Sequence, residues 1–198
     1  MLEKLIITKI EKQQKRERCN IWINGAYSFS IFQANLLRLD LKNGQALTKT
    51  EIEEIKKKDN FWRIYQRALL ILSYRAQARE ELRRKLLKYF EVPLIEEVIK
   101  RLEEEKLIND QEFVQEYISQ SKKGKKAIRH DLLKKGVDKE TIERGLNSLS
   151  LADEIERAKL ILKKMRLEKP LGEKMRLKVM RRLQSKGFSY EVIKSVVK

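Results

Sequence analysis

The side chains best suited to chemistry in this sequence are clustered lysines and arginines. Flexible lysines pair with phosphate groups, and arginines recognise the same anions through a planar, two-pronged geometry. The densest cluster lies within residues 122–135, and similar clusters recur within 83–88 and 178–186. Recurrence at three places favours a binding role over a merely solvated surface, which is the usual alternative for a single charged run. The candidate residues for binding a polyanion are Arg83, Arg84, Lys85, Lys88, Lys122, Lys123, Lys125, Lys126, Arg129, Lys134, Lys135, Lys178, Arg181, Arg182 and Lys186.

The whole chain carries a strong positive charge. Its 198 residues include 46 Lys and Arg against 29 Asp and Glu, which gives a net charge of +17. Such an excess raises the local concentration of polyanions and speeds encounter with them. Residues 151–198 hold the largest excess, with 14 basic and 6 acidic side chains. We therefore expect nucleic acid, or a complex that contains it, as the partner; a helical surface that is simply well solvated is the alternative.

Residues that usually carry catalysis or bind metals are sparse. His130 is the only histidine and has no cysteine nearby, so no metal site is expected. A nuclease would need carboxylates that converge on Mg²⁺, whereas the glutamates of 96–97 and 103–105 lie beside lysines and arginines, as on salt-bridged helix surfaces. The sequence has no phosphate-binding glycine loop and no nucleophile elbow. We expect a protein that is not an enzyme and needs no cofactor.

Cysteine content and hydropathy indicate the cellular compartment. Cys19 is the single cysteine and cannot form an internal disulfide, and the sequence does not open with a basic region followed by a long apolar run. Charged residues interrupt every hydrophobic cluster, so no stretch approaches the ~20 apolar residues of a membrane span. A cytoplasmic protein that is not integral to a membrane is expected.

Residues 1–60 are the only segment with strand chemistry. Asn24-Gly25 lies between two runs rich in β-branched and aromatic residues, a strong signal for a β-hairpin, because both turn residues tolerate positive φ. Residues 4–10 could add a third strand. Two short helices are expected over 36–41 and 49–58, the second with Thr50 as its N-cap. Trp22, Tyr27 and Phe29 could stack on bases, but alternating aromatics in a hairpin more often pack against each other. The segment predicts a small α+β head.

From residue 61 onward the apolar residues follow a helical period, and the sequence repeats itself. Ile128, Leu132 and Gly136 recur 51 positions later as Val179, Leu183 and Gly187, and a third copy upstream contains Leu82 and Leu86 but no glycine. Each glycine is expected to end a helix in the left-handed conformation, with Asp138 or Ser189 capping the next helix. A unit of this size buries little core alone, so three should stack into an elongated, curved array. The expected divisions are a head over 1–60 and three-helix repeats over 61–110, 111–152 and 153–198.

Three motifs resemble those of the RecX regulatory proteins of bacteria. They are Leu82-Arg83-Arg84-Lys85-Leu86, Leu107-Ile108-Asn109-Asp110-Gln111-Glu112-Phe113, and Gly124-Lys125-Lys126-Ala127-Ile128 leading to Leu132-Leu133-Lys134-Lys135-Gly136-Val137. The resemblance spans essentially the whole chain and rests on the order, the intervals and the threefold repetition of the motifs. One departure is Ala78, where relatives usually carry a serine that caps the following helix, so the start of that helix is uncertain.

The resemblance implies a fold of three tandem three-helix repeats and a partner, the filament of the RecA recombinase on single-stranded DNA. Family members are thought to restrain ATP hydrolysis, filament growth and strand exchange, and so to act in recombination, DNA repair and the SOS response. The basic residues named above would then contact RecA or DNA, with weak binding to double-stranded DNA possible and a monomer expected.

A DNA-binding protein without a recombinase partner is the other hypothesis. The helix, glycine turn and helix of the second and third repeats superficially fit a helix-turn-helix repressor. The helix after the turn argues against a recognition helix, because its first turn carries Asp138 and Glu140 in one copy and Glu191 in the other. Carboxylates there suit the helix dipole and would repel DNA phosphates.

Overall fold

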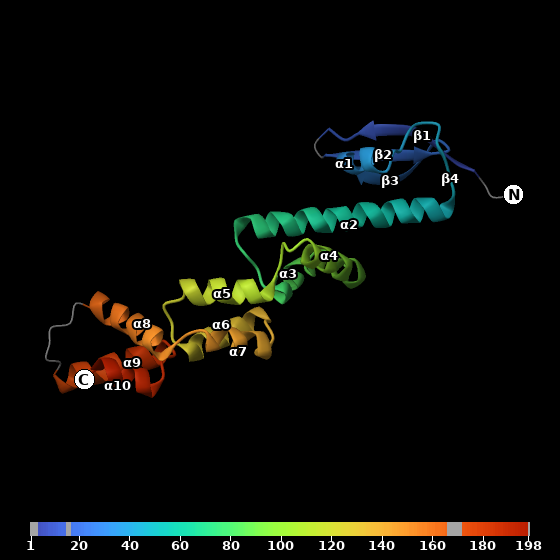
Figure 1. Cartoon of the computed structure of the whole chain (residues 1–198). Helices are drawn as coiled ribbons and strands as arrows, with labels where there is room; N and C mark the ends of the chain where they lie inside the picture. Colours follow the sequence, from blue (N-terminus) through green and yellow to red (C-terminus); the bar gives the residue numbers. More distant parts are fainter. Residues whose placement is uncertain (1–3, 15–16, 166–171, 198) are drawn as a thin grey trace. The chain divides into compact units, whose positions relative to one another are not determined.

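The structure of the protein, a computed structural model, describes residues 4–14, 17–165 and 172–197. Within these residues, four strands lie in the N-terminal part and helices make up most of the remainder (Figure 1). The chain forms two compact units, Met1–Arg75 with Lys85–Arg101 and Ala76–Arg84 with Leu102–Lys198. The expectation of a mainly α protein with a small α+β head is confirmed.

The head is a four-stranded antiparallel sheet in the order β3-β2-β1-β4. The predicted hairpin is present, since Asn24 and Gly25 take φ values of 49° and 82° between β2 and β3. The expected third strand is β1, and it also pairs with a short fourth strand that the sequence pattern did not predict. The strands are β1 (Leu5–Lys12), β2 (Arg18–Ile23), β3 (Ala26–Phe32) and β4 (Ala46–Leu47).

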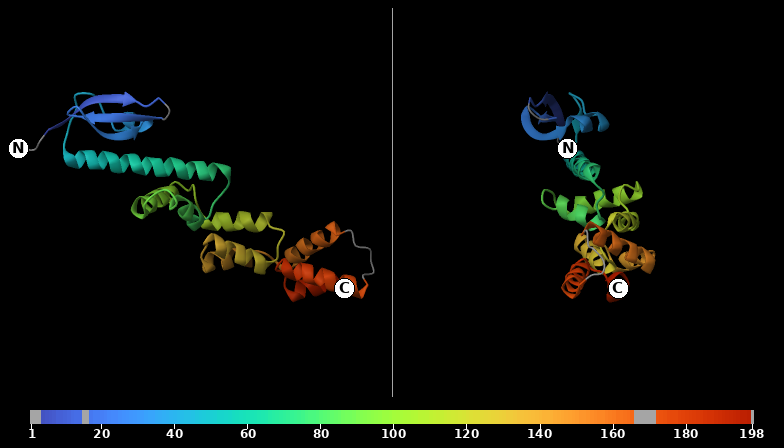
Figure 2. Two further views of the ribbon diagram at one scale, coloured as in Figure 1. Left: turned by 180° about the vertical axis from the view of Figure 1, so that it is seen from behind. Right: turned by 90° about the vertical axis from the view of Figure 1, so that its left-hand side faces the viewer.

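The two helices of the head differ from the prediction. Helix α1 spans Gln33–Arg38 and stops before Asp40, whose φ of 46° is incompatible with a continuing helix, so the range 36–41 was wrong. Helix α2 spans Lys49–Tyr74 and runs along the sheet in both views of the head (Figures 1 and 2). Its N-cap is Thr48, which forms a capping box with Glu51, so the prediction of Thr50 and of a short helix ending at residue 58 was also wrong.

A buried carboxylate explains why α2 continues through a polar stretch. Asp59 is 3% exposed and accepts hydrogen bonds from the Phe32 backbone N–H at 3.0 Å and from Asn35 Nδ2 at 2.7 Å. Arg18 Nη2 lies 3.3 Å from the same carboxylate and completes its pairing. A buried charge is tolerated only when it is satisfied in this way. Asp59 thus fixes the middle of α2 to β2, β3 and α1.

Aromatic residues of the head mainly pack. Phe29 is buried in the core of the sheet, as expected, and Trp22 meets Tyr27 edge-on with ring centroids 6.1 Å apart. On α2, the ring of Trp62 lies 4.1 Å from the guanidinium carbon of Arg38 on α1, a cation–π contact. The contact joins α1 to α2.

Among the described residues eight helices follow α2, and together with the last part of α2 they make up three sets of three in chain order, as the repeat predicts. The expected first repeat, 61–110, therefore begins within the last part of α2. Charged and apolar residues alternate at helical spacing in each helix, so each presents one apolar stripe to its neighbours. The helices are α3 (Arg79–Leu86), α4 (Val92–Glu104), α5 (Asp110–Gln120), α6 (Lys125–Lys135), α7 (Lys139–Asn147), α8 (Leu151–Lys164), α9 (Glu173–Ser185) and α10 (Tyr190–Val197).

The matched residues of the repeats form the cores. Ile128 and Leu132 of α6 are fully buried in a cluster shared with α5 and α7, and Phe113 of α5 belongs to it. Val179 and Leu183 of α9 are fully buried in an equivalent cluster with α8 and α10. The i, i+4 spacing therefore identified the buried face of the second helix in both repeats.

The predicted caps are confirmed. Gly136 and Gly187 take φ values of 86° and 81° after α6 and α9, a conformation that residues with a Cβ rarely adopt. Asp138 then accepts a hydrogen bond from the Thr141 backbone N–H at 2.8 Å, and Ser189 accepts one from the Val192 backbone N–H at 3.3 Å.

The same glycines also join neighbouring repeats. A Cβ at Gly187 would overlap Ala127 at the start of α6, and a Cβ at Gly136 would overlap Glu80 at the start of α3. At the first of these contacts the backbones bond directly, because the Gly124 N–H donates to the Lys186 carbonyl at 3.0 Å and the Lys126 N–H donates to the Gly187 carbonyl at 3.2 Å. Each turn glycine therefore ends the helix of its own repeat and leaves room for the start of a helix in the repeat before it to pack closely against it.

The start of α3 is fixed despite the missing serine cap. Ala78 is fully buried in the core of the second repeat, and α3 begins at Arg79. The Arg79 backbone N–H donates to Asp110 Oδ1 at 2.8 Å, so a carboxylate from α5 takes the place of the absent side-chain cap. Burial raises the pKa of Asp110, and the hydrogen bond from Arg79 only partly offsets that rise.

In the part of the chain that the structure describes, no helix combines the length and the apolar character needed to cross a membrane.

Candidate nucleic-acid and protein interface

The most open cationic surface lies on α9 of the third repeat. Lys178, Arg181 and Arg182 are exposed, whereas Val179 and Leu183 of the same helix are fully buried. The fourth predicted residue of this repeat, Lys186, is exposed at the C-terminal end of the same helix. Among the described residues, none of these four cations has an ion pair within 4.0 Å, so their charge faces solvent.

The prediction overlooked one residue of this surface. Lys174 is exposed and precedes Lys178 by one helical turn, so it extends the same face of α9. The i, i+4 spacing from Lys178 was the signal that could have found it. The α9 face is defined here as Lys174, Lys178, Arg181 and Arg182.

In the second repeat, the predicted residues separate into two groups. Lys122 precedes α6, whereas Lys126 and Lys134 lie on the solvent side of the helix, and all three are exposed. Lys125 is half-buried, and its backbone N–H donates to Glu154 Oε1 of α8 at 3.1 Å. The exposed lysines can reach an external anion, whereas three other predicted cations of this repeat pair with carboxylates of the protein.

Three predicted cations of the second repeat have internal carboxylate partners. Lys123 pairs with Asp131, and Arg129 forms a two-pronged pair with Glu143, with Nη2 2.8 Å from Oε2. The hydrogen bond from Arg129 lowers the pKa of Glu143. Burial raises the pKa of Asp131, but hydrogen bonds from Lys123 and from the Tyr117 hydroxyl outweigh burial and hold that pKa below its ordinary value.

Lys135 is the third engaged cation. Its Nζ lies 3.0 Å from Glu81 Oε2 of α3 and also within 6.0 Å of the ring centroids of Phe113 and Tyr117. Burial, followed by its hydrogen bond to Asp131, raises the pKa of Tyr117 to about 12, so its hydroxyl stays protonated and donating at neutral pH. These contacts join α3, α5 and α6, and they give Lys135 a structural role.

The first repeat contributes less open charge. Arg84 Nε lies 3.1 Å from Glu80 Oε1, and its Nη1 donates to the Lys134 carbonyl at 3.0 Å. Arg83 lies 3.7 Å from the same Glu80 carboxylate. Lys85 is half-buried, and Lys88 is exposed. The predicted site residues are therefore not one continuous set, and the second and third repeats present most of the open charge.

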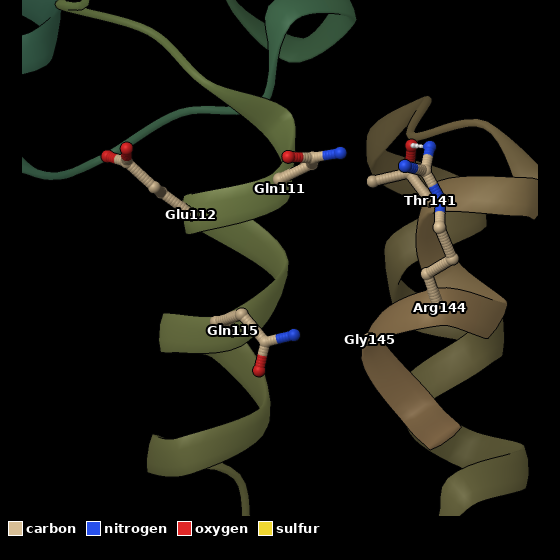
Figure 3. A pocket seen from close by; sticks show the side chains of 6 residues that line it. All are labelled: Gln111, Glu112, Gln115, Thr141, Arg144 and Gly145. Carbon is tan, nitrogen blue, oxygen red and sulfur yellow. Dashed lines mark hydrogen bonds between the residues drawn. The ribbon is translucent and has the colours of Figure 1, made fainter. Parts of the chain in front are cut away.

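A separate pocket of about 450 Å³ lies between α5 and α7. Figure 3 shows Gln111 and Gln115 pointing across it toward α7, whereas Glu112 points away. Arg144 bends back along α7 and donates to the Thr141 hydroxyl at 3.3 Å. Among the described residues that line this pocket, no histidine or cysteine supplies a nucleophile or a base. In the same described part of the chain, no three His, Cys, Asp or Glu residues gather as metal ligands.

Four family models match successive parts of the chain. They are the regulatory protein RecX N-terminal domain over residues 5–48 and the first, second and third three-helix domains of RecX over 65–102, 109–146 and 152–197. The chain belongs to the RecX family. The resemblance found in the sequence motifs is thereby confirmed, together with the three three-helix repeats.

Individual RecX proteins are similar along nearly the whole chain. Regulatory protein RecX of Bacillus subtilis (strain 168) is 37% identical over 199 residues, which cover 96% of this chain and 75% of the relative. Regulatory protein RecX of Clostridioides difficile (strain 630) is 32% identical over 199 residues, covering 97% and 94%. A crystal structure of regulatory protein RecX superposes with a TM-score of 0.70 at 28% identity, covering 97% of this chain and 98% of that one.

Proposed function

We propose that this RecX-family protein binds RecA filaments on single-stranded DNA and restrains their ATP hydrolysis, growth and strand exchange. Membership of the RecX family carries the proposal, because its relatives are named as regulatory proteins. The net charge of +17 and the open cations of α6 and α9 support it, since a filament on DNA presents closely spaced phosphates.

The placement of the open cations suits contact with a repeating polyanion. Lys126 and Lys134 lie on α6, and the α9 face lies on the equivalent helix of the next repeat. The second helix of successive repeats therefore presents positive charge without an internal carboxylate partner. Phosphate contacts of this kind position a protein on a nucleic acid without reading its sequence. Binding without strong sequence preference follows.

We further propose a regulator that works by binding alone, as a cytoplasmic monomer, with no catalytic step and no cofactor. The proposed divisions of the chain remain the head over 1–60 and repeats over 61–110, 111–152 and 153–198. Action on RecA would place the protein in recombination, DNA repair and the SOS response.

Steady-state ATP hydrolysis by the host's RecA on single-stranded DNA tests the proposal. Substoichiometric to equimolar amounts of this protein should slow hydrolysis, and electron microscopy of the same mixtures should show shorter RecA filaments. Boiled protein and an equally basic unrelated protein serve as controls for nonspecific competition for DNA. Unchanged hydrolysis together with unchanged filament length would refute the proposal.

The repressor hypothesis is disfavoured by the helix that would have to read the DNA. Asp138 is occupied as the N-cap of α7, and the side chain of Glu140 is 82% exposed in the first turn. A recognition helix would bring this carboxylate close to phosphates. A footprint at one operator sequence would revive the hypothesis, whereas uniform binding to any single strand would not.

A further inference from the structure

A cleft of about 240 Å³ lies between α9 and α10, apart from the α9 face. Arg176 borders it and is two positions from both Lys174 and Lys178, which places Arg176 on nearly the opposite side of the helix. The cleft is smaller than the ~300–1,000 Å³ typical of sites that enclose a drug-sized ligand, so it suits a single ring system. Its lining residues are Arg176, Met180, Tyr190, Ile193, Lys194 and Val197.

The cleft combines an apolar lining, an exposed aromatic ring and two cations. Met180, Ile193 and Val197 are half-buried or buried and form an apolar lining. Tyr190 is 68% exposed at the first residue of α10, and, among the described residues, no aromatic ring stacks on it. A large aromatic side chain left open to water beside an apolar hollow loses the burial that normally stabilises it.

Two cations complete the arrangement. Arg176 and Lys194 line the cleft from different helices, and both are exposed. Neither has a carboxylate within 4.0 Å in the described part of the chain. An aromatic ring and two open cations that line one cleft match a nucleotide, which combines a flat ring with an attached phosphate.

We propose that this cleft binds one unpaired base of single-stranded nucleic acid, with the base stacked on Tyr190 and its flanking phosphates held by Arg176 and Lys194. A base inside a duplex is stacked on both faces and cannot present its ring to Tyr190, so the site selects single strands. The inference rests on the proposed binding to DNA-bound filaments, and it adds a base-contacting site to the phosphate contacts of the α9 face.

Binding of this protein alone to oligo(dT) and to an abasic oligomer of equal length tests the site, because only the first carries bases. Tyr190→Ala should weaken binding to oligo(dT) on the order of tenfold and leave binding to the abasic oligomer unchanged. Tyr190→Phe keeps the ring and should bind oligo(dT) like the native protein. Tyr74→Ala removes an equally open tyrosine, 81% exposed at the end of α2, and should have no effect.

Photocrosslinking to an oligonucleotide that carries 5-iodo-deoxyuridine gives an independent readout. Mass spectrometry should place the crosslink at Tyr190, and circular dichroism should show that Tyr190→Ala remains folded. Equal losses on both oligomers, no loss on either, or crosslinks only elsewhere would overturn the site. If native protein still slows ATP hydrolysis by RecA in those cases, the proposed function stands and only the cleft assignment fails.

Discussion

Neutralising the α9 face provides the most direct test of where the protein binds DNA. The variant K178Q/R181Q/R182Q removes three exposed cations and introduces a residue type with good helix propensity. The buried pair Val179 and Leu183 is untouched, so each substitution should change the free energy of unfolding by less than about 0.5 kcal/mol.

The expected size of the effect follows from counterion release. Each phosphate neutralised on a single strand contributes about 0.7 to the slope of log affinity against log salt. If the three side chains each contact one phosphate, the slope of the variant should be shallower by about two. Between 50 and 200 mM salt the native affinity should then fall roughly 20-fold more than that of the variant.

Fluorescence anisotropy of labelled oligo(dT) across a salt series measures both slopes. A matched control neutralises Lys42, Lys56 and Lys159, which already pair with Asp40, Glu53 and Glu156 two or three residues away in the sequence. The control loses the same net charge and should keep the native slope. A native slope in the α9 variant would show that these side chains do not contact phosphate. Equal changes in the two variants would show that net charge and not this face determines binding.

Three further predictions concern stability and are measured by urea unfolding followed by circular dichroism. Gly124→Ala should destabilise the protein by about 1–3 kcal/mol, because its Cβ would overlap the backbone of the next repeat, whereas Gly172→Ala has open space and should be near neutral; equal effects would contradict the close contact. Asp110→Ala should lower the free energy of unfolding by about 1 kcal/mol, because it uncaps α3. Asp110→Asn should lower it less, since it keeps a hydrogen-bond acceptor and removes a carboxylate whose pKa burial has raised. A larger loss of stability for the Asn variant than for the Ala variant would refute this reasoning. Hydrogen bonds from Thr141 lower the pKa of Asp138, so the contribution of this carboxylate to the free energy of unfolding is present above the ordinary carboxyl pKa of 3.8 and is lost as the pH falls through the lowered pKa. The loss of stability caused by Asp138→Ala should therefore shrink in acid. A loss of stability that is independent of pH would argue against this role of Asp138.

Local patterns predicted the repeats because their determinants lie close together in the sequence. The i, i+4 pairs such as Ile128 with Leu132 identified the buried faces, and Gly136 with Asp138 identified a helix end and the next start. These signals depend on residues within one or two helical turns. Each of them is confirmed in the structure.

The helix boundaries in the head were predicted wrongly, and one reason is that contacts between residues far apart in the sequence determine them. Thr48 and Thr50 are each followed three residues later by a glutamate, so the sequence alone did not distinguish the two possible capping boxes. The polar residues near Asp59 suggested a helix end, but partners 24 to 41 residues away satisfy that carboxylate within a continuous helix. Tertiary contacts of this kind are invisible to local periodicity.

The candidate interface was likewise predictable only in part, because the pairing of its cations depends on residues far apart in the sequence. Composition found the basic clusters, but it could not show which cations already have partners. Glu143 is 14 residues from Arg129, and Glu81 is 54 residues from Lys135, so only the folded chain reveals these pairs. The α9 cations were separable in principle, because few acidic residues lie near them in the sequence.

The double use of the turn glycines constrains how such a protein can evolve. A duplicated repeat inserted between the second and third repeats would need a turn glycine that packs against the start of a helix in the repeat before it. It would also need a helix start that packs closely against the turn glycine of the repeat after it. The second and third repeats meet the first condition through Gly136 and Gly187. The first repeat follows α2, so its turn has no helix start of an earlier repeat to pack against, which accounts for the absence of a glycine there. Gene duplication could therefore lengthen the array with copies of the later repeats, but a copy of the first repeat would leave a gap or a clash at its junction.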